Sequence, residues 1–328
     1  MLKNIEDKYQ RYFEEYKNFH QGENISSCYL EQCCERNEFN NCCLMSFDSF
    51  NKTDQIFLVV PSIFNSPEIL FISRTKGFIR HLQEFGKVYL IDWHEIDDPN
   101  FNFNNYISQI CEILVFLSQR TNNLVNIIGH CIGGNMAAAA AFLHNKLVNT
   151  LMLLTTPWDF SHFINLQQPN YLLVLDANIK NLDKVPKIYI QILFFLLFPN
   201  YFDTKLDKYF SLELKKDKDL FLKIEKWLMS GHSLPKAVYY QIRDDLSVTN
   251  LQLKNIWKIG DIVVDFSSFD KPVYHVVAKN DQIVPKSSVL PLHRSLKNSR
   301  MFEVKGGHIS YLINDAITDI LSIYAHPH

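Results

Sequence analysis

The chain has 328 residues, of which 47% are hydrophobic and 21% are charged, so its composition is globular and excludes extensive disorder. Its 33 basic and 35 acidic residues give a formal net charge of −2, and the absence of a dense basic run argues against nucleic-acid binding. The length suits one large α/β domain with an insertion.

Residues 1–50 begin with a helical pattern and then become rich in cysteine. The first residues are charged and aromatic and lack the apolar stretch of a secretory signal. The most hydrophobic run, residues 188–199, is about half of the ~20 residues that span a bilayer. We therefore expect a soluble, cytoplasmic protein without a transmembrane segment.

The seven cysteines are an odd number, which favours reduced thiols over a disulfide framework. The two adjacent pairs lack the C-x₂-C spacing with which two thiolates grip one zinc ion. We expect ordinary thiols and no metal at these positions: Cys28, Cys33, Cys34, Cys42, Cys43 and Cys111, with Cys131 considered separately below.

Strand and helix patterns alternate from residue 55 to residue 160, which is typical of a parallel sheet covered by helices on both faces. Short, continuous apolar runs predict strands over residues 55–62, 87–93, 124–130 and 150–160. Helical spacing predicts helices over residues 75–86, 104–121 and 135–147.

The alternation stops between residues 161 and 245, where aromatic-rich helical segments follow one another, and it returns with strands over 272–281 and 299–308 and a helix over 313–324. The simplest organisation is one α/β core interrupted by a helical cap. We therefore expect an N-terminal helical and cysteine-rich extension, a core in two parts and a cap insertion: residues 1–50, residues 51–160 with 246–328, and residues 161–245.

The segment "IIGHCIGGN" has the pattern strand, G-x-Cys-x-G, helix, which is typical of a nucleophile elbow. Gly129 and Gly133 flank Cys131 two residues away on each side, and Gly134 follows. Glycine suits these positions because a Cβ atom would collide with the neighbouring strand or helix. The alternative is a chance match around a small buried cysteine.

An elbow nucleophile requires an acid and then a histidine later in the chain. Asp281 follows one predicted strand, and His308 follows the last one, after a pair of glycines. Both positions lie at carboxyl ends of strands, where open α/β sheets place their sites. Cys131, Asp281 and His308 are therefore the candidate catalytic triad. A turn-forming Asn-Asp pair and a surface histidine are the alternatives.

Together these residues resemble the polyhydroxyalkanoate synthase family, and most of all its short class III catalytic subunit. The similarity runs over about residues 50–325 and is carried by these stretches: "VVPSIFNSPEILFI", "GFIRHLQEFGKVYLIDW", "NIIGHCIGG", "LLTTPWDF", "KIEKWL", "LPKAVYYQI", "PVYHVVAKNDQIVP" and "KGGHI". The resemblance implies the α/β-hydrolase fold and the polymerisation of 3-hydroxyacyl-coenzyme A.

In that reaction Cys131 would carry the acyl group, His308 would act as its base, and Asp281 would orient His308. Backbone N–H groups of Ile132 and of Ser62 or Ile63 would bind the oxyanion. No cofactor is expected beyond the acyl-CoA substrate. The resemblance also implies a growing polyester as ligand, a helical partner subunit, a location at the polyester granule surface and compatibility with a homodimer.

Four departures from the family pattern bear on the activity. The proline-containing loop "NSPEIL" lacks the tyrosine that the family has there. Gln282 follows the catalytic aspartate where the family has histidine, His130 precedes the nucleophile where an aromatic residue is usual, and Lys286 replaces a frequent tryptophan. Two alternatives therefore stay open. The same triad serves a cysteine hydrolase, either a thioesterase or a polyester depolymerase, if water reaches the acyl-enzyme. A non-catalytic granule-associated protein is the second.

Overall fold

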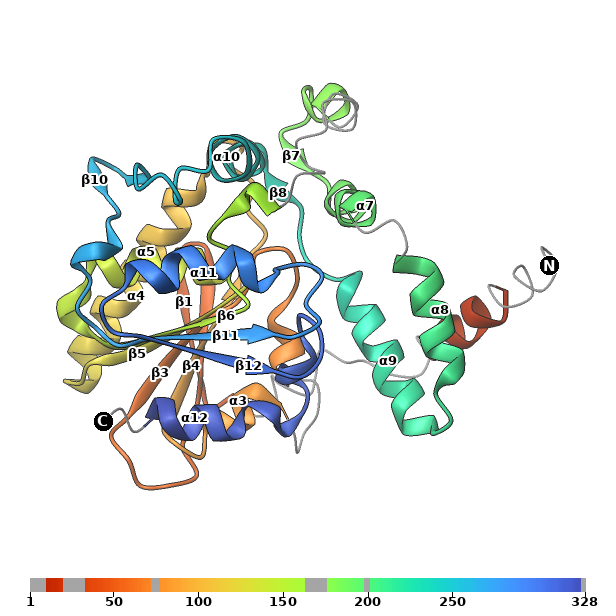
Figure 1. Ribbon diagram of the computed structural model, residues 1–328, viewed down its shortest axis with the longest axis horizontal. Helices are drawn as coiled ribbons and strands as arrows, with labels where there is room; N and C mark the ends of the chain where they lie inside the picture. Colours follow the sequence, from red (N-terminus) through yellow and green to blue (C-terminus); the bar gives the residue numbers. More distant parts are fainter. Residues whose placement is uncertain (1–9, 20–32, 72–76, 163–175, 198–200, 326–328) are drawn as a thin grey trace.

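The computed structural model describes residues 10–19, 33–71, 77–162, 176–197 and 201–325. Its centre is an eight-stranded sheet in the order β1-β2-β4-β3-β5-β6-β11-β12 (Figure 1). Strand β2 runs antiparallel to both of its neighbours, β1 and β4, and all other neighbouring strands pair in parallel. The strands are β1 (Glu35–Phe39), β2 (Cys42–Phe47), β3 (Ile56–Val60), β4 (Lys87–Trp93), β5 (Val125–His130), β6 (Val148–Leu154), β11 (Val273–Ala278) and β12 (Ser299–Val304).

Helices cover both faces of the sheet, as predicted (Figure 1). One face carries α4 (Phe103–Thr121), α5 (Ile132–Leu143) and α11 (Lys286–Ser295), and the other carries α3 (Phe78–Leu82) and α12 (Thr318–Ala325). The central strands β3 and β5 are buried along their whole length, because helices exclude water from both of their sides. Five consecutive buried alanines, residues 137–141, let α5 lie close to β5.

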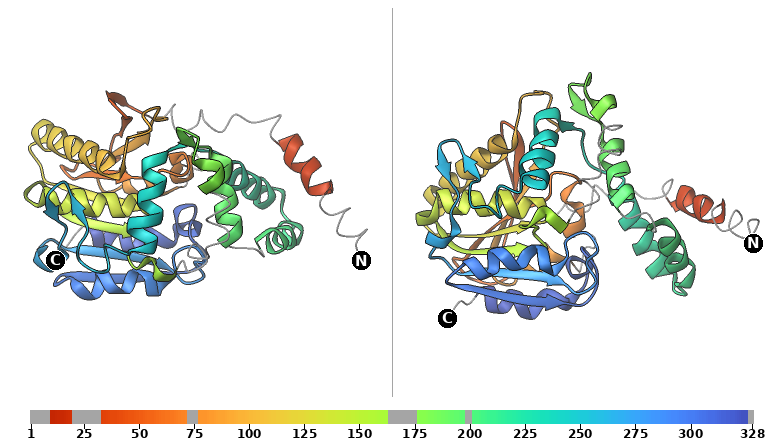
Figure 2. Two further views of the ribbon diagram at one scale, coloured as in Figure 1. Left: turned by 90° about the horizontal axis from the view of Figure 1, so that it is seen from above. Right: turned by 45° about the horizontal axis from the view of Figure 1, so that its top comes forward.

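The insertion between β6 and β11 contains helices, as the sequence predicts, and its first part, residues 163–175, lies outside the described residues. Helices α7 to α9 lie to one side of the α/β body, and the helix over residues 10–19 lies beyond them (Figure 2). The elements are β7 (Lys184–Val185), α7 (Lys187–Leu197), α8 (Tyr201–Ser211), α9 (Lys215–Leu228), β8 (Leu234–Pro235), α10 (Lys236–Gln241), a π-helix (Ile242–Val248), β9 (Lys258–Ile259) and β10 (Ile262–Val263).

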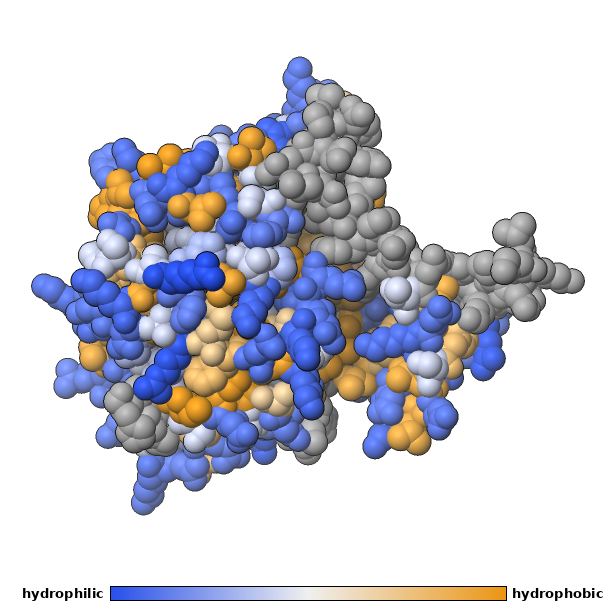
Figure 3. All heavy atoms as spheres, viewed as in Figure 1, coloured by the Kyte–Doolittle hydropathy of each residue, from blue (hydrophilic) through white to orange (hydrophobic). Residues whose placement is uncertain are grey.

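Short 3₁₀ segments connect several of these elements: η1 (Pro67–Phe71), η2 (Asn145–Leu147), η3 (Phe160–His162), η6 (Phe266–Ser268), η7 (Ser310–Leu312) and η8 (Asp315–Ile317). The face of the molecule shown in Figure 1 is mainly hydrophilic, with smaller hydrophobic areas between charged side chains (Figure 3). None of the helices in the described ranges is both long and apolar enough to cross a membrane.

The sheet begins earlier than residue 51, where the sequence pattern placed the start of the core. Strand β2 pairs with β4 from Cys42–Trp93 to Phe47–Val88, and all six of its residues are buried. The cysteine-rich region therefore supplies two strands of the main sheet. The N-terminal helix packs against the cap instead, where Tyr12 contacts Tyr209 of α8 with ring centroids 5.1 Å apart.

Candidate active site

Cys131 lies in a sharp turn between the last residue of β5 and the first residue of α5. Its backbone has φ 55° and ψ −131°, a region that non-glycine residues rarely adopt. Two hydrogen bonds hold the turn, because the Cys131 N–H donates to the carbonyl of Leu154 on β6 and the N–H of Gly134 donates to the Cys131 carbonyl, both at 2.9 Å. This strained geometry is that of a nucleophile elbow.

The three glycines around Cys131 are required by close packing. A Cβ atom on Gly129 would lie 2.4 Å from Cα of Gly134, and one on Gly133 would lie 2.3 Å from the carbonyl oxygen of Pro61. A Cβ atom on Gly134 would lie 1.9 Å from Oγ1 of Thr156. The turn is therefore fixed against both neighbouring strands, β3 and β6.

The structure brings Asp281 and His308 together with Cys131. His308 Nδ1 lies 2.8 Å from Asp281 Oδ2, and the Cys131 sulfur lies close enough to the imidazole to influence its pKa. The other carboxylate oxygen of Asp281 accepts hydrogen bonds from the N–H groups of Ile283 and Val284, both at 2.8 Å. A carboxylate, an imidazole and a thiol therefore lie in series, in the order in which the sequence pattern predicts them.

The charges of this series control the ionisation of His308, whose side chain is 10% exposed. Burial alone lowers the pKa of the imidazole, because it penalises the charged form. Interactions with Cys131 and with Asp281, which accepts the hydrogen bond of the imidazole, outweigh that penalty and raise the pKa of His308 to about 10. The site therefore favours the charged form of the His308 imidazole at neutral pH.

A second histidine lies beside the triad without belonging to it. The ring of His130 is 5.4 Å from that of His308, centroid to centroid, and is 3% exposed. Burial and the neighbouring His308 lower the pKa of His130 well below its usual value, so this imidazole is neutral. The sequence shows that His130 directly precedes Cys131, but it does not predict that the two histidine rings lie side by side.

Tyr311 is another neighbour that sequence patterns did not identify. Its hydroxyl lies 2.8 Å from Oγ1 of Thr155, directly after β6, and the side chain is fully buried. Burial raises the pKa of Tyr311 well above its ordinary value, and the negative charges of Asp281 and Cys131 act in the same direction. Tyr311 therefore presents a neutral hydroxyl close to the candidate triad.

The predicted oxyanion donors lie around the same turn. Ile132 is the first residue of α5, so its N–H has no acceptor within the helix. In the loop after β3, Ser62 Oγ already accepts the N–H of Phe64 at 3.2 Å. Ser62 and Ile63 are buried and belong to the loop whose Pro61 carbonyl touches Gly133. The assignment of Ile132, Ser62 and Ile63 to an oxyanion hole stays a prediction.

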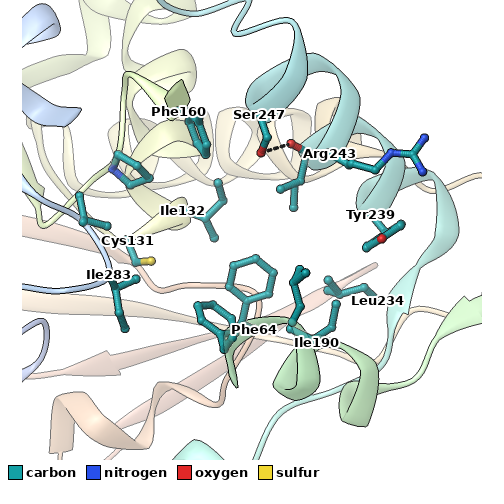
Figure 4. Close-up of a pocket in the computed structure, with 15 residues that line it drawn as sticks. Phe64, Cys131, Ile132, Phe160, Ile190, Leu234, Tyr239, Arg243, Ser247 and Ile283 are labelled. Carbon is teal, nitrogen blue, oxygen red and sulfur yellow. Dashed lines mark hydrogen bonds between the residues drawn. The ribbon is translucent and has the colours of Figure 1, made fainter. Parts of the chain in front are cut away.

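Cys131 faces a pocket formed between the α/β body and the cap (Figure 4). Its sulfur lies at one end and Tyr239 and Arg243 lie at the other (Figure 4). Helix α7 contributes Ile190, Leu193 and Phe194 to the wall, so the apolar run noted in the sequence lines this pocket. The remaining lining residues are also mostly apolar: Phe64, Ile132, Pro157, Phe160, Leu234, Ile242, Ser247, Ile283 and Val284.

The other cysteines lie outside this site. All six cysteines in the described ranges are free thiols, whereas Cys28 falls outside those ranges. Burial raises the pKa of Cys42 and of Cys111 to about 12, which keeps both thiols protonated. Within the described residues, no group of three or more histidine, cysteine, aspartate or glutamate side chains is arranged to hold a metal ion.

Sequence relatives share most of the chain. The poly(3-hydroxyalkanoate) polymerase subunit PhaC of Haloarcula marismortui is 26% identical over 278 residues, which are 81% of this chain and 58% of the relative. The PhaC subunit of Thiocystis violacea is 27% identical over 269 residues, 78% of this chain and 75% of the relative. The chain thus spans little more than half the length of the haloarchaeal relative.

Solved structures show the same fold at low sequence identity. MenH from S. aureus superposes with a TM-score of 0.58 at 13% identity, covering 87% of this chain and 98% of MenH. A sequence model of the family described as alpha/beta hydrolase fold matches residues 94–315. The chain therefore belongs to the α/β-hydrolase fold family, and its curated sequence relatives are PhaC polymerase subunits.

Proposed function

We propose that the chain is an acyltransferase that polymerises 3-hydroxyacyl-coenzyme A into polyester through a thioester on Cys131. The observation that carries the proposal is the series Asp281–His308–Cys131, which opens into an apolar pocket. The similarity to PhaC polymerase subunits supports the choice of substrate.

The first step transfers the acyl group from coenzyme A to the enzyme. The Cys131 thiolate attacks the thioester carbonyl, a new carbon–sulfur bond forms, and the bond to the coenzyme A sulfur breaks. The departing thiolate takes the proton that the His308 imidazolium holds. Exchange of one thioester for another is nearly isoenergetic, and a thiolate is a good nucleophile near neutral pH. This explains cysteine in a turn where related folds commonly use serine.

The second step makes the ester bond of the polymer. The hydroxyl of a hydroxyacyl unit attacks the Cys131 thioester while neutral His308 accepts the hydroxyl proton, and the bond to the Cys131 sulfur breaks as the ester forms, which restores the thiolate beside the imidazolium. Asp281 stabilises the imidazolium and holds its orientation through the 2.8 Å contact. The N–H groups of Ile132 and of Ser62 or Ile63 stabilise the oxyanion in both steps.

The pocket determines whether the acyl-enzyme meets a hydroxyl or water. Its walls are aliphatic and aromatic, and the Cys131 side chain is nearly buried within them. Such a lining suits a polyester chain and disfavours water, whose attack would release a free acid. We further propose that a helical partner subunit and the granule surface complete the active assembly, as the resemblance to the class III subunit implies.

The test is incubation of the purified chain with 3-hydroxybutyryl-CoA, with and without a candidate helical partner, followed by measurement of free coenzyme A, free acid and insoluble polymer. We expect coenzyme A release with polymer. Release of free acid alone would instead identify a hydrolase, and no release under either condition would contradict the proposal.

Variants test the nucleophile in the same assay. We expect Cys131→Ala to abolish coenzyme A release, and Cys131→Ser to retain at most weak activity because an alkoxide needs far more assistance than a thiolate. Cys33→Ala is the matched control, since Cys33 is a half-buried thiol on the N-terminal side of β1. Coenzyme A release that persists in Cys131→Ala would exclude the mechanism.

A further inference from the structure

The loop that follows β3, residues 62–66, is bound to the end of cap helix α9. The side-chain amide of Asn65 points to the last turn of that helix and donates towards three carbonyl oxygens, those of Trp227 and Leu228 at 3.2 Å and that of Ser230 at 3.3 Å. Carbonyl groups at a helix C-terminus lack partners within the helix. Asn65 therefore caps α9 from another part of the chain.

Hydrogen bonds also run from the cap back to the loop. The indole Nε1–H of Trp227 donates to the carbonyl of Ser66 at 2.7 Å. Ser230 Oγ lies 3.2 Å from Ser66 Oγ and accepts the N–H of Ser66 at 3.4 Å. Trp227 is 7% exposed, so the indole bond is shielded from water. The loop and the helix end are thus joined through several groups on each side.

Close packing reinforces these bonds on the side that faces the pocket. Gly231 has φ +102°, and a Cβ atom there would lie 2.1 Å from the carbonyl oxygen of Phe64. The ring of Phe64 meets that of Phe194 on α7 edge to face, with centroids 5.7 Å apart. Phe64 and Cys131 line the same pocket (Figure 4).

The same loop begins beside the nucleophile. Pro61 touches the elbow at Gly133, and Ser62 and Ile63 carry the N–H groups assigned above to the oxyanion. Only one or two residues separate these donors from Asn65. If the cap displaces Asn65, the backbone N–H groups of Ser62 and Ile63 move with it. A displacement of about 1 Å is enough to weaken their hydrogen bonds to the oxyanion.

We propose that the C-terminal end of α9 positions the oxyanion loop, so that the cap must be packed on the body before acylation is fast. Asn65 and Trp227 are positioning residues in this arrangement, and neither is assigned contact with the reacting atoms. The role of the loop in binding the oxyanion rests on the proposed function. The structural coupling between α9 and residues 62–66 does not depend on which substrate is bound.

The kinetic test compares Asn65→Ala and Trp227→Phe with the wild-type chain. Trp227→Phe keeps an aromatic ring, removes the indole donor and shortens the buried ring system. We expect each to lower kcat for coenzyme A release about tenfold or more while KM changes less than about twofold, because the lost interaction acts mainly on the transition state. Asn65→Gln, which keeps the amide donors, restores part of kcat. The matched control is Asn51→Ala, which removes a similar 2.7 Å bond from an exposed asparagine to the Glu84 carbonyl.

Hydrogen exchange provides a readout that does not need turnover. In Trp227→Phe we expect amides of residues 62–66 to exchange faster, although the change lies in the cap, while amides of β11 keep their wild-type rates. Unchanged exchange at residues 62–66 would overturn the coupling, as would wild-type kcat in Asn65→Ala. If the wild-type chain releases no coenzyme A, the proposed function fails, and the exchange experiment still decides the coupling.

Discussion

The ionisation of His308 follows from its two neighbours. An imidazole that is 10% exposed would ordinarily be neutral at pH 7, because burial penalises its charged form. Here the neighbouring Cys131 sulfur and the carboxylate of Asp281, which accepts a hydrogen bond from Nδ1 of the imidazole, favour the charged form, so the pKa of His308 rises to about 10. The ion pair of His308 with Asp281 contributes its full stabilisation below about pH 6.5, the pKa of histidine in the unfolded chain. That stabilisation is lost as the pH rises through about 10, the pKa of His308 in the folded chain.

The first prediction concerns the reactivity of Cys131. The positive charge on His308 stabilises the thiolate, so we expect iodoacetamide to modify Cys131 rapidly even near pH 6. His308→Gln removes that charge and should slow modification about tenfold or more at pH 6 to 7. Mass spectrometry of the Cys131 peptide measures the rate. Cys111, a half-buried thiol with its pKa raised to about 12 by burial, is the internal control. Equal rates for wild type and variant would contradict the charged pair.

A second prediction concerns His275, a fully buried residue in the middle of β11. Burial, together with the nearby His293, lowers the pKa of His275 to about 3. The unfolded chain therefore binds one more proton here below about pH 6.5, and stability falls as pH decreases, by up to about 1.4 kcal/mol per pH unit. We expect His275→Leu to flatten this dependence by about one proton, measured from urea unfolding between pH 4.5 and 7.5. An unchanged slope would show that His275 is not responsible.

The turn between β5 and α5 depends on glycine for a reason that substitution can test. In Gly133→Ala the new Cβ atom would lie 2.3 Å from a backbone carbonyl oxygen, and backbone has little freedom to move away. We expect a loss of about 2 kcal/mol or more of unfolding free energy. Gly307→Ala is the control, because its Cβ atom would have ordinary contacts at 3.7 Å. Equal melting temperatures for the two variants would contradict the close packing.

Several elements could be predicted from sequence because their signals are local. The strand over residues 87–93 has the predicted bounds, and α4 and α5 begin within three residues of the predicted starts. Strand β6 ends at Leu154 and not at residue 160, since Thr155 turns to φ 41° and Pro157 follows. The β1–β2 hairpin was missed because its strands are rich in cysteine and charge. The Asn40-Asn41 turn between them was the available signal.

At the scale of the whole molecule, the chain order of Cys131, Asp281 and His308 was sufficient to predict that the three side chains lie together, because the topology of the sheet brings these strand ends together. Their role as a catalytic triad stays a prediction. The bonds between Asn65 and α9 could not be predicted in this way. They join a loop to a helix end about 160 positions away, and no periodic pattern records which carbonyl groups an asparagine will meet.

Truncation tests the extent of the folded unit. A chain starting at residue 33 retains β1 and β2, whereas a chain starting at residue 51 leaves the side of β4 unpaired and removes buried Leu44, Met45 and Phe47. We expect the first to unfold cooperatively on heating and the second to be insoluble or without a cooperative transition. Circular dichroism of the two purified chains distinguishes these outcomes. A cooperative melt of the shorter chain would show that the hairpin is dispensable.

The outer strand β1 has a further consequence for crowded conditions. Its exposed positions are Arg36 and Glu38, whose side chains are 48% and 62% accessible to solvent. A second copy adding a strand alongside β1 would have to strip water from both charges. Even at high local concentration, copies of the chain are therefore not expected to pair through their β1 edges and form a continuous intermolecular sheet.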